Sequence, residues 1–142
     1  MKLSTKGRYG VRLMIDIASN YNGRPIFLRD IAKRQDISEK YLWHLIDSLK
    51  IAGLISSVRG AHGGYRLAKN AEEINLNDII LATEGNIGIV ECVKDPSSCE
   101  RSETCATIDV WKDVSDKISE TLKAISLKDM VETQKNKIDN NN

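Results

Sequence analysis

Apolar side chains recur at intervals of three and four residues through the first third of this 142-residue chain. That spacing is typical of amphipathic helices, and it predicts a helix over residues 7–20, a short one over 28–35 and a third over 39–51. The inward-facing positions are Val11, Leu13, Met14, Ile15, Ile17 and Ala18, then Leu28, Ile31 and Ala32, then Leu42, Leu45, Ile46 and Leu49.

Turn and cap residues separate the second helix from the third. Residues 36–38 interrupt the apolar pattern, and the Ser38 hydroxyl suits the N-cap of the third helix. Gly53 stands just past the last turn of that helix, where a C′ glycine is expected. Two short helices with a three-residue break between them are typical of a helix-turn-helix, here Leu28 to Ile51.

Two short strands are predicted directly after the helix-turn-helix. Residues 55–58 and 65–68 have strand character, and a glycine-rich loop that carries Arg59 and His62 joins them. A β-hairpin in this place is a wing, so the pattern predicts a winged helix. A further helix is expected to end near Gly85.

The C-terminal third contains one strongly amphipathic segment, residues 106–125. One face of this helix is too apolar for solvent, so it either covers the chain's own core or pairs with the same helix of a second copy. We expect a homodimer through this face, which consists of Ile108, Trp111, Ile118, Leu122 and Ile125.

The predicted fold is therefore mainly α-helical with one small β-hairpin wing. Residues 1–85 form a winged helix-turn-helix DNA-binding domain, and residues 86–105 form a cysteine-bearing loop. Residues 106–131 form the dimerisation helix and its extension. The polar residues 132–142 are expected to be a disordered tail.

Charge is divided unevenly along the chain, although the net charge is only +1. Residues 1–70 hold thirteen Lys and Arg against five Asp and Glu, a net of +8, whereas residues 71–142 carry a net of −7. A basic half joined to an acidic half favours a polyanion as the partner of the first half. No apolar run is long enough to span a bilayer, and the N-terminus lacks an apolar signal region, so a cytoplasmic protein without membrane contact is expected.

Basic and polar residues of the first half are placed to contact double-stranded DNA. The third helix would present its outward face to the major groove, and Arg59 at the wing tip would enter a minor groove. Trp43 is a large aromatic residue on that outward face, where it either contacts DNA or packs against a neighbouring helix. The candidate contacts are Lys2, Lys6, Arg8, Ser38, Lys40, Tyr41, Trp43, His44, Arg59, Gly60, Gly64 and Tyr65.

All three cysteines fall inside fourteen residues, as Cys92, Cys99 and Cys105 with the spacing C-x6-C-x5-C. This polar stretch cannot form a core of its own, and thiolates are preferred ligands of soft metals and iron–sulfur clusters. The spacing is wider than the C-x2-C units of structural zinc, and the set is one ligand short of four. Free thiols, or one disulfide with a spare thiol, are the alternatives, and the lack of a secretory signal disfavours the disulfide.

Three segments of the sequence resemble the Rrf2 family of bacterial winged-helix regulators. They are MKLSTKGRYG at residues 1–10, ISEKYL at 37–42 and VRGAHGGY at 58–65, and the likeness extends to about Val131. The resemblance implies a homodimer whose C-terminal helices cross, a palindromic DNA site and, in cluster-bearing members, three cysteines before that helix. The cysteines and residues 110–116 are similar to the IscR branch, which favours a [2Fe-2S] over a [4Fe-4S] cluster.

Departures from the family pattern concern the fourth cluster ligand and the site preference. IscR-type proteins place a histidine at the position of Ile108, their first loop is one residue shorter, and NsrR-type proteins use an aspartate at the position of Arg8. IscR-type recognition helices carry a glutamate at the position of Trp43, so their preferred DNA sequence does not transfer. The fourth ligand stays open among solvent, a small thiol, Glu91, Asp95, Glu103 and Asp109.

These observations support two regulators of different kinds. One is a repressor whose DNA affinity is modulated by an iron–sulfur cluster, which senses cluster, iron, redox or nitric oxide status. The other is a cluster-free, CymR-like repressor of cysteine and sulfur metabolism, controlled by a partner protein and carrying redox-active thiols. A structural zinc site is a further alternative. An enzyme is not expected, because the chain has no C-x-x-C pair, no nucleotide-binding glycine motif and no His/Asp constellation.

Overall fold

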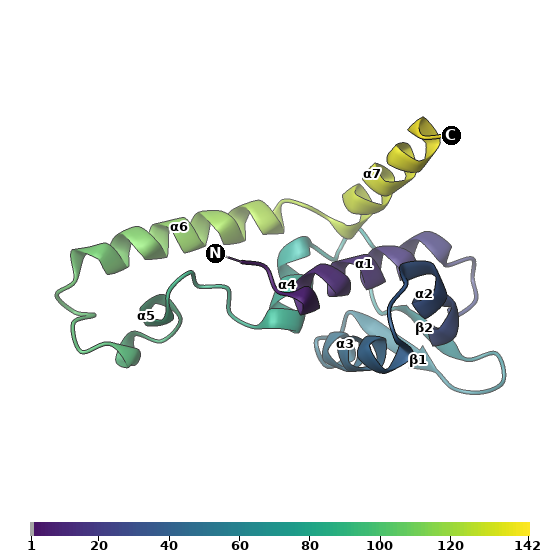
Figure 1. Cartoon of the computed structure of the whole chain (residues 1–142), viewed down its shortest axis with the longest axis horizontal. Coiled ribbons are helices and arrows are strands. Elements are labelled where there is room, and N and C mark those ends of the chain that lie inside the picture. Colours follow the sequence, from purple (N-terminus) through teal and green to yellow (C-terminus); the bar gives the residue numbers. More distant parts are fainter. Residues whose placement is uncertain (1) are drawn as a thin grey trace.

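The computed structural model describes residues 2–142, and position 1, the predicted start of the DNA-binding domain, lies outside them. The structure is mainly helical with one two-stranded antiparallel sheet, as the sequence predicts (Figure 1). The elements are α1 (Thr5–Asn20), α2 (Leu28–Gln35), α3 (Glu39–Ile51), β1 (Ile55–Val58), β2 (Gly64–Leu67), α4 (Leu76–Glu84), α5 (Glu91–Lys94), the 3₁₀ helix η1 (Pro96–Ser98), α6 (Ala106–Lys123) and α7 (Leu127–Asn140).

The helix-turn-helix of α2 and α3 has the predicted bounds. The chain turns at Asp36, which adopts a left-handed conformation with φ of 53° and donates its backbone N–H to Ala32. The Ser38 hydroxyl then accepts a hydrogen bond of 3.2 Å from the backbone N–H of Tyr41 and caps α3. Gly53 follows the helix with φ of 74°, a value that favours glycine.

One hydrophobic core joins α1 to α4, the hairpin and the start of α7. The predicted apolar stripes of α1 and α3 face this core, which holds Leu127 as well. Its buried members are Leu13, Met14, Ile17, Ile26, Ile31, Ile37, Leu42, Leu45, Ile46, Leu49, Leu54, Ile55, Ile74, Ile79 and Leu127.

Helices α1 and α4 pack unusually close, because two glycines of α1 face α4. A Cβ atom at Gly10 would lie 2.6 Å from Cγ2 of Thr83, and one at Gly7 would collide with the Glu84 carboxylate. That carboxylate also accepts a 2.7 Å hydrogen bond from the backbone N–H of Ser4. The N-terminal arm before α1 is thereby fastened to the end of α4.

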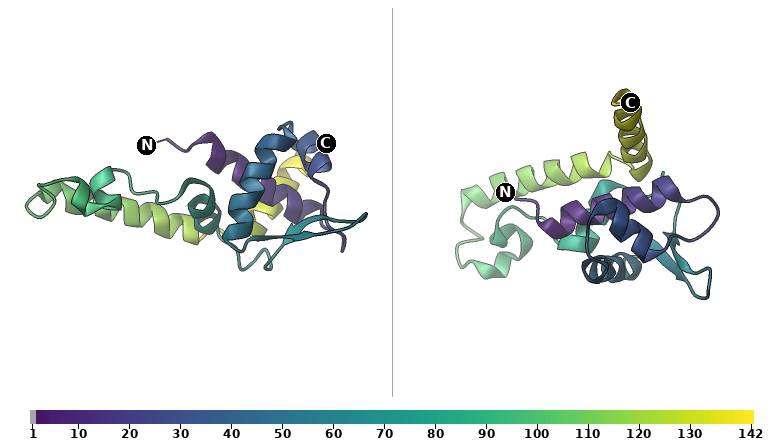
Figure 2. Two further views of the ribbon diagram at one scale, coloured as in Figure 1. Left: turned by 90° about the horizontal axis from the view of Figure 1, so that it is seen from below. Right: turned by 45° about the vertical axis from the view of Figure 1, so that its right-hand side comes forward.

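The wing pairs β1 with β2, with Ile55 opposite Leu67 and Val58 opposite Gly64. The second strand begins and ends one residue earlier than the predicted range 65–68. A third segment supports the hairpin, because Ile26 and Tyr65 exchange two backbone hydrogen bonds of 2.8 and 2.9 Å. The hairpin projects from one end of the molecule, and the cysteine loop and the start of α6 lie at the other end (Figure 2).

The C-terminal segment differs from the prediction in two ways. The helix predicted over 106–125 ends at Lys123, and its expected extension is a separate helix, α7, that packs back against α1. The prediction of a disordered tail over 132–142 was wrong, since α7 continues to Asn140. A capping box starts α7, with Ser126 and Asp129 exchanging hydrogen bonds of 2.9 and 3.0 Å, and the buried Leu127 anchors it.

None of the described helices is long and apolar enough to cross a lipid bilayer.

A buried carboxylate ties α1 to α2. Asp16 is only 3% exposed and accepts hydrogen bonds of 2.7 and 3.0 Å from the Arg34 guanidinium and one of 2.8 Å from the Gln35 amide. The hydrogen bond to Asp16 raises the pKa of Arg34 above its usual value. Arg34 itself is 38% exposed, so the pair has one buried and one hydrated partner.

That asymmetry predicts unequal costs for the two single substitutions. Arg34→Met should cost about 3–5 kcal/mol of unfolding free energy, because it leaves the buried carboxylate without its cation. Asp16→Asn should cost only about 2 kcal/mol, because the guanidinium can turn to water. Urea unfolding measures both changes. The control is Arg29→Met, which breaks an exposed pair of 4.0 Å and should cost under about 1 kcal/mol; equal losses for Arg34→Met and Asp16→Asn would contradict this account.

Candidate DNA-binding surface and cysteine loop

Four exposed side chains form one stripe along α3. Lys40, Trp43, His44 and Asp47 follow the spacing i, i+3, i+4 and i+7, and all four are exposed. Trp43 is 54% exposed, and its indole meets the edge of the His44 ring, at 5.4 Å between centroids and an interplanar angle of 76°. The opposite face of α3 is buried, which fixes the orientation of this stripe.

Several predicted DNA contacts have structural partners within the chain. The Ser38 hydroxyl caps α3, and the half-buried Tyr41 ring meets the edge of Tyr9 at 5.8 Å between centroids. The backbone of Tyr65 is committed to Ile26. These residues shape the surface, whereas the stripe on α3 presents the free polar groups.

The wing tip exposes Arg59, Gly60 and His62. The loop is a tight turn in which Gly63 donates its N–H to the Gly60 carbonyl at 3.0 Å. Gly60 has φ of 110°, and a Cβ at Gly63 would collide with the carbonyl of Val58. The two glycines therefore hold the Arg59 side chain at the end of a narrow projection.

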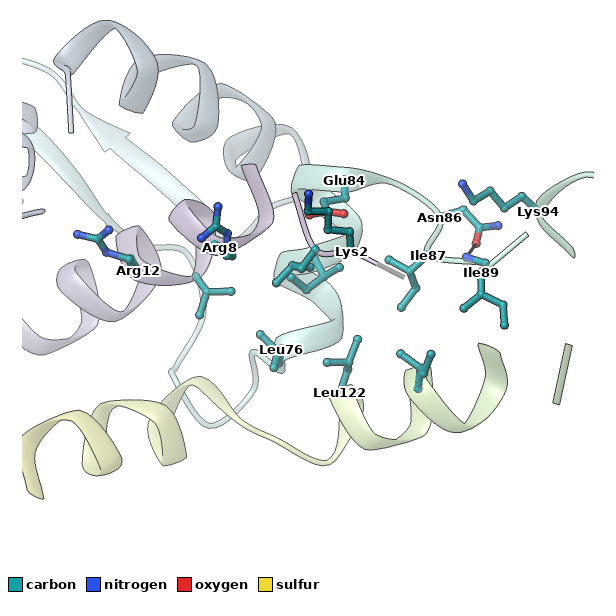
Figure 3. A pocket seen from close by; sticks show the side chains of 15 residues that line it. Lys2, Arg8, Arg12, Leu76, Glu84, Asn86, Ile87, Ile89, Lys94 and Leu122 are labelled. Carbon is teal, nitrogen blue, oxygen red and sulfur yellow. Dashed lines mark hydrogen bonds between the residues drawn. The ribbon is translucent and has the colours of Figure 1, made fainter. Parts of the chain in front are cut away.

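The basic residues of the N-terminus separate into two groups. Lys2 and Arg8 line a groove of about 810 Å³ between α1, α4 and α6, whereas Lys6 is exposed outside it. Figure 3 shows the side chains of Leu76, Ile87 and Leu122 gathered from three segments, with Arg8, Arg12 and Lys94 around them. The floor of the groove is apolar: Leu3, Val11, Leu76, Ile80, Ile87, Ile89, Ile118 and Leu122.

The predicted dimerisation residues do not all share this groove. Ile118 and Leu122 line it and also line a second, shallower hollow on α6 together with Val114. Trp111 is 40% exposed, and Val110 and Val114 extend the uncovered apolar surface. Ile108 is half-buried, and Ile125 lies after the end of α6, beside Ile15, Asp129 and Met130. The apolar face therefore continues along α6 from the groove toward the cysteine loop.

The three cysteines occupy different parts of the segment between α4 and α6. Cys92 lies in α5, Cys99 follows η1, and Cys105 precedes the first residue of α6. All three are half-buried free thiols. Among the described residues, no three His, Cys, Asp or Glu side chains are arranged as a metal site. The structure thus places the thiols on one segment without bringing them together.

The candidate fourth ligands are also separate from one another. Glu91 forms an ion pair of 3.6 Å with Lys94, and Asp95 accepts hydrogen bonds from both the backbone and the hydroxyl of Ser97. Glu103 and Asp109 are exposed. None of the four is held toward the thiols by a hydrogen bond, so the structure singles out no fourth ligand.

Three thiols are suitable ligands for a soft metal centre, although they lie apart from one another in this structure. Hydrogen bonds from the Thr107 hydroxyl, at 3.1 Å, and from the backbone N–H groups of Thr107 and Ile108 hold the pKa of the Cys105 thiol below its usual range. A thiolate is the form that binds metal. Three thiolates on short, irregular segments can gather around an iron–sulfur cluster without disturbing a long helix.

Two hydrogen-bonded connections, one within the cysteine segment and one just before it, were not predicted from the sequence. Ile89 donates its backbone N–H to the Ser115 hydroxyl at 3.2 Å, and that hydroxyl donates to the Trp111 carbonyl at 2.8 Å. Glu84, one residue before Gly85, holds the N-terminal arm. The available signals were a serine within the apolar face of α6 and the Gly7-x-x-Gly10 spacing on α1, which leaves one helix face without side chains and allows a close backbone approach.

Comparisons with known proteins agree with this arrangement. Residues 3–133 match the Rrf2 family, described as "Iron-dependent Transcriptional regulator". The HTH-type transcriptional regulator IscR of Photorhabdus laumondii is 40% identical over 94% of this chain and 81% of its own.

Two solved structures are similar along nearly the whole chain. CymR of B. subtilis, titled its global cysteine regulator, has a TM-score of 0.77 at 38% identity and covers 94% of this chain and 98% of its own. IscR of T. potens has a TM-score of 0.76 at 40% identity and covers 94% of this chain and 88% of its own. These relatives are regulators of transcription and not enzymes. The chain belongs to the Rrf2 family of winged-helix transcriptional regulators.

Proposed function

We propose that this chain is a homodimeric, sequence-specific DNA-binding repressor whose DNA affinity depends on an iron–sulfur cluster held by Cys92, Cys99 and Cys105. The observation that carries the proposal is the placement of every cysteine of the chain on the one segment that joins α4 to α6. Similarity to IscR proteins at about 40% identity supports it. The division into a DNA-binding part, residues 1–85, a sensing loop, 86–105, and the dimerisation helix α6 belongs to the same proposal.

A second copy of the chain is the occupant that best suits the apolar face of α6. Val110, Trp111 and Val114 are 53%, 40% and 38% exposed on a helix that also carries Ile118 and Leu122. Such a surface is stabilised when a matching surface covers it. Two copies related by a two-fold axis would place two α3 helices on the two halves of a palindromic DNA site.

The cysteine loop has connections through which its state can reach the DNA-binding parts. Its first residues are tied to the middle of α6 by the Ser115 hydroxyl, and the preceding helix α4 holds the N-terminal arm through Glu84. When bound, the cluster supplies a centre whose oxidation and integrity respond to redox and iron status. Cluster state changes affinity if it favours one arrangement of the two DNA-binding units over another.

A cluster-free repressor is the second candidate. The similarity to CymR, with a TM-score of 0.77, supports it as the similarity to IscR, with a TM-score of 0.76, supports the first candidate. In that case a partner protein would control DNA binding, and the thiols would act in redox chemistry. Purified protein separates the two candidates, because a cluster gives visible absorption and free thiols give none.

The cluster proposal predicts loss of iron on removal of any one cysteine. Protein purified without oxygen should be brown and contain iron and sulfide, whereas Cys92→Ala, Cys99→Ala and Cys105→Ala should be colourless, because three thiolates are the minimum set. Each variant should remain a dimer, since the substitutions leave the apolar side chains of α6 unchanged. Ser98→Ala, an exposed neighbour in the same loop, should keep its iron. A colourless wild-type protein supports the second candidate, and iron in all three cysteine variants overturns the ligand assignment.

The dimer proposal predicts that charge on the α6 face gives monomers. Ile118→Glu with Leu122→Glu should dissociate the dimer and weaken specific DNA binding, because one half-site supplies half of the contacts. Sedimentation and gel-shift measurements test both effects. Lys112→Glu with Lys123→Glu adds the same type of side chain at exposed positions of the same helix and should stay dimeric. A double glutamate variant that remains dimeric and binds tightly would end this idea.

The wing proposal predicts different effects for two basic residues. Arg59→Ala should cost about 1–3 kcal/mol of specific binding, if the side chain reads the minor groove. Lys6→Ala should weaken binding to specific and random duplexes alike and lower the salt slope by about 1, as expected for a phosphate contact. Titrations at several salt concentrations measure both. An equal effect of Arg59→Ala on specific and random DNA would contradict a reading role.

A further inference from the structure

The most exposed aromatic side chain of the helix-turn-helix is not accounted for by the fold. Trp43 is 54% exposed, and the aromatic ring that pairs with it among the described residues is that of His44. The helix cannot rotate to hide the indole, because its neighbours Leu42 and Ile46 are 0% and 2% exposed in the core. An indole held outward with more than half of its surface in water would gain free energy from an external surface that covers it.

The proposed dimer does not supply that surface. Figure 1 shows α3 on the side of α1 and α4 away from α6, whose apolar face and groove carry the dimer proposal. The second view of the whole chain shows the same separation (Figure 2). The occupant of the Trp43 position must therefore approach from the side of α3.

The neighbours of Trp43 define the chemistry of that occupant. Lys40 and His44 adjoin it in the exposed stripe, within the basic half of the chain. Trp43 lies five residues after Ser38, the N-cap of α3. It therefore belongs to the N-terminal turns, which contact base edges in helix-turn-helix proteins. A polyanion that presents an apolar group among its base edges would be complementary to Lys40, Trp43 and His44. The 5-methyl group of thymine is the apolar feature that the major groove offers.

We propose that Trp43 is a specificity-determining residue that selects thymine by packing its indole against the thymine 5-methyl group in the major groove. This inference rests on the proposed DNA-binding function and adds the base that the exposed indole recognises. The indole contributes apolar area, and Lys40 and His44 contribute polar contacts on either side of it. The contact discriminates against cytosine, which lacks the methyl group.

Replacing thymine by deoxyuridine tests the contact, because it removes the methyl group and leaves the base pair unchanged. A preferred duplex is first selected from random DNA with the full-length wild-type protein, and each thymine is then replaced in turn. We expect affinity to fall about fourfold at one thymine of each half-site, the factor for burying one methyl group. Trp43→Ala should bind the thymine and uracil duplexes equally, and Trp43→Phe should keep part of the preference.

Two further measurements separate a contact from a structural effect. Tyr21→Ala removes another exposed aromatic ring, 45% exposed at the end of α1, and should keep the full preference for thymine. The chain holds two tryptophans, so the fluorescence that wild type shows and Trp43→Phe lacks comes from Trp43, and it should become protected from acrylamide when the selected duplex binds. Thermal unfolding by circular dichroism should show all variants folded, since the substituted side chains are exposed or replaced by a similar ring.

The outcomes distinguish this inference from the function on which it rests. Selection that yields no preferred duplex overturns both. A selected duplex with no thymine sensitive to loss of its methyl group overturns the role of Trp43 alone. The role of Trp43 is also overturned if Trp43→Ala distinguishes thymine from uracil as well as wild type does. The same conclusion follows if acrylamide still quenches Trp43 fluorescence in the complex, and the indole would then be free for a protein partner.

Discussion

The close packing of α1 on α4 is the constraint from which the arrangement of the other parts follows. Gly7 and Gly10 let the two backbones approach, and Thr83 and Glu84 occupy the space that side chains would fill. Because α4 is fixed in this way, the Glu84 carboxylate is in position to hold the Ser4 backbone and with it the N-terminal arm. The same contact fixes the direction in which the chain leaves α4 toward the cysteine loop. The contact of α1 with α4 therefore connects the helix-turn-helix core, the arm and the entrance of the loop.

Beyond α4 the chain has few apolar anchors until it reaches α6. The loop is held by local hydrogen bonds, such as the Asp95 cap of η1, and by the bond from Ile89 to Ser115 of α6. A polar segment of this kind can take up more than one arrangement at low cost, because little buried surface is lost when it moves. Free thiols that lie apart fit such a segment, and ligation of a shared centre would draw them together. The uncovered face of α6 begins where this loop ends, so a rearrangement of the loop would adjoin the proposed dimer interface.

The elements with local signals could be predicted from the sequence, and the long-range contacts could not. The stripe of α3, the Ser38 cap and the positive φ of Gly53 follow from spacing and residue type, and all three are confirmed. The prediction of a disordered tail failed because the polar composition was given more weight than a local helix signal. Ser126 and Asp129 form a capping box that starts α7, and Leu127 inserts into the core formed by the preceding helices and the hairpin. The partner of Asp16 was equally hidden, since no local pattern indicates that Arg34 lies beside it. The exposure of Trp43 needed the fold as well, because a helical pattern alone cannot exclude a neighbouring helix.

The separation of wing and cysteine loop limits how one can influence the other. They lie at opposite ends of the molecule, with the α1–α4 unit between them (Figure 2). A change in the loop therefore has no direct path to Arg59 or to the stripe on α3. It can alter the contacts of α6, through Ser115, or the position of the arm, through Glu84. In a dimer, a small rotation at α6 moves each DNA-binding unit as a rigid body and changes the spacing between the two recognition helices. Binding to a palindrome depends on that spacing, whereas binding of one unit to a single half-site does not. An effect of the loop that passes through α6 would therefore need the proposed dimer, whereas an effect that passes through Glu84 and the arm would act within a single chain.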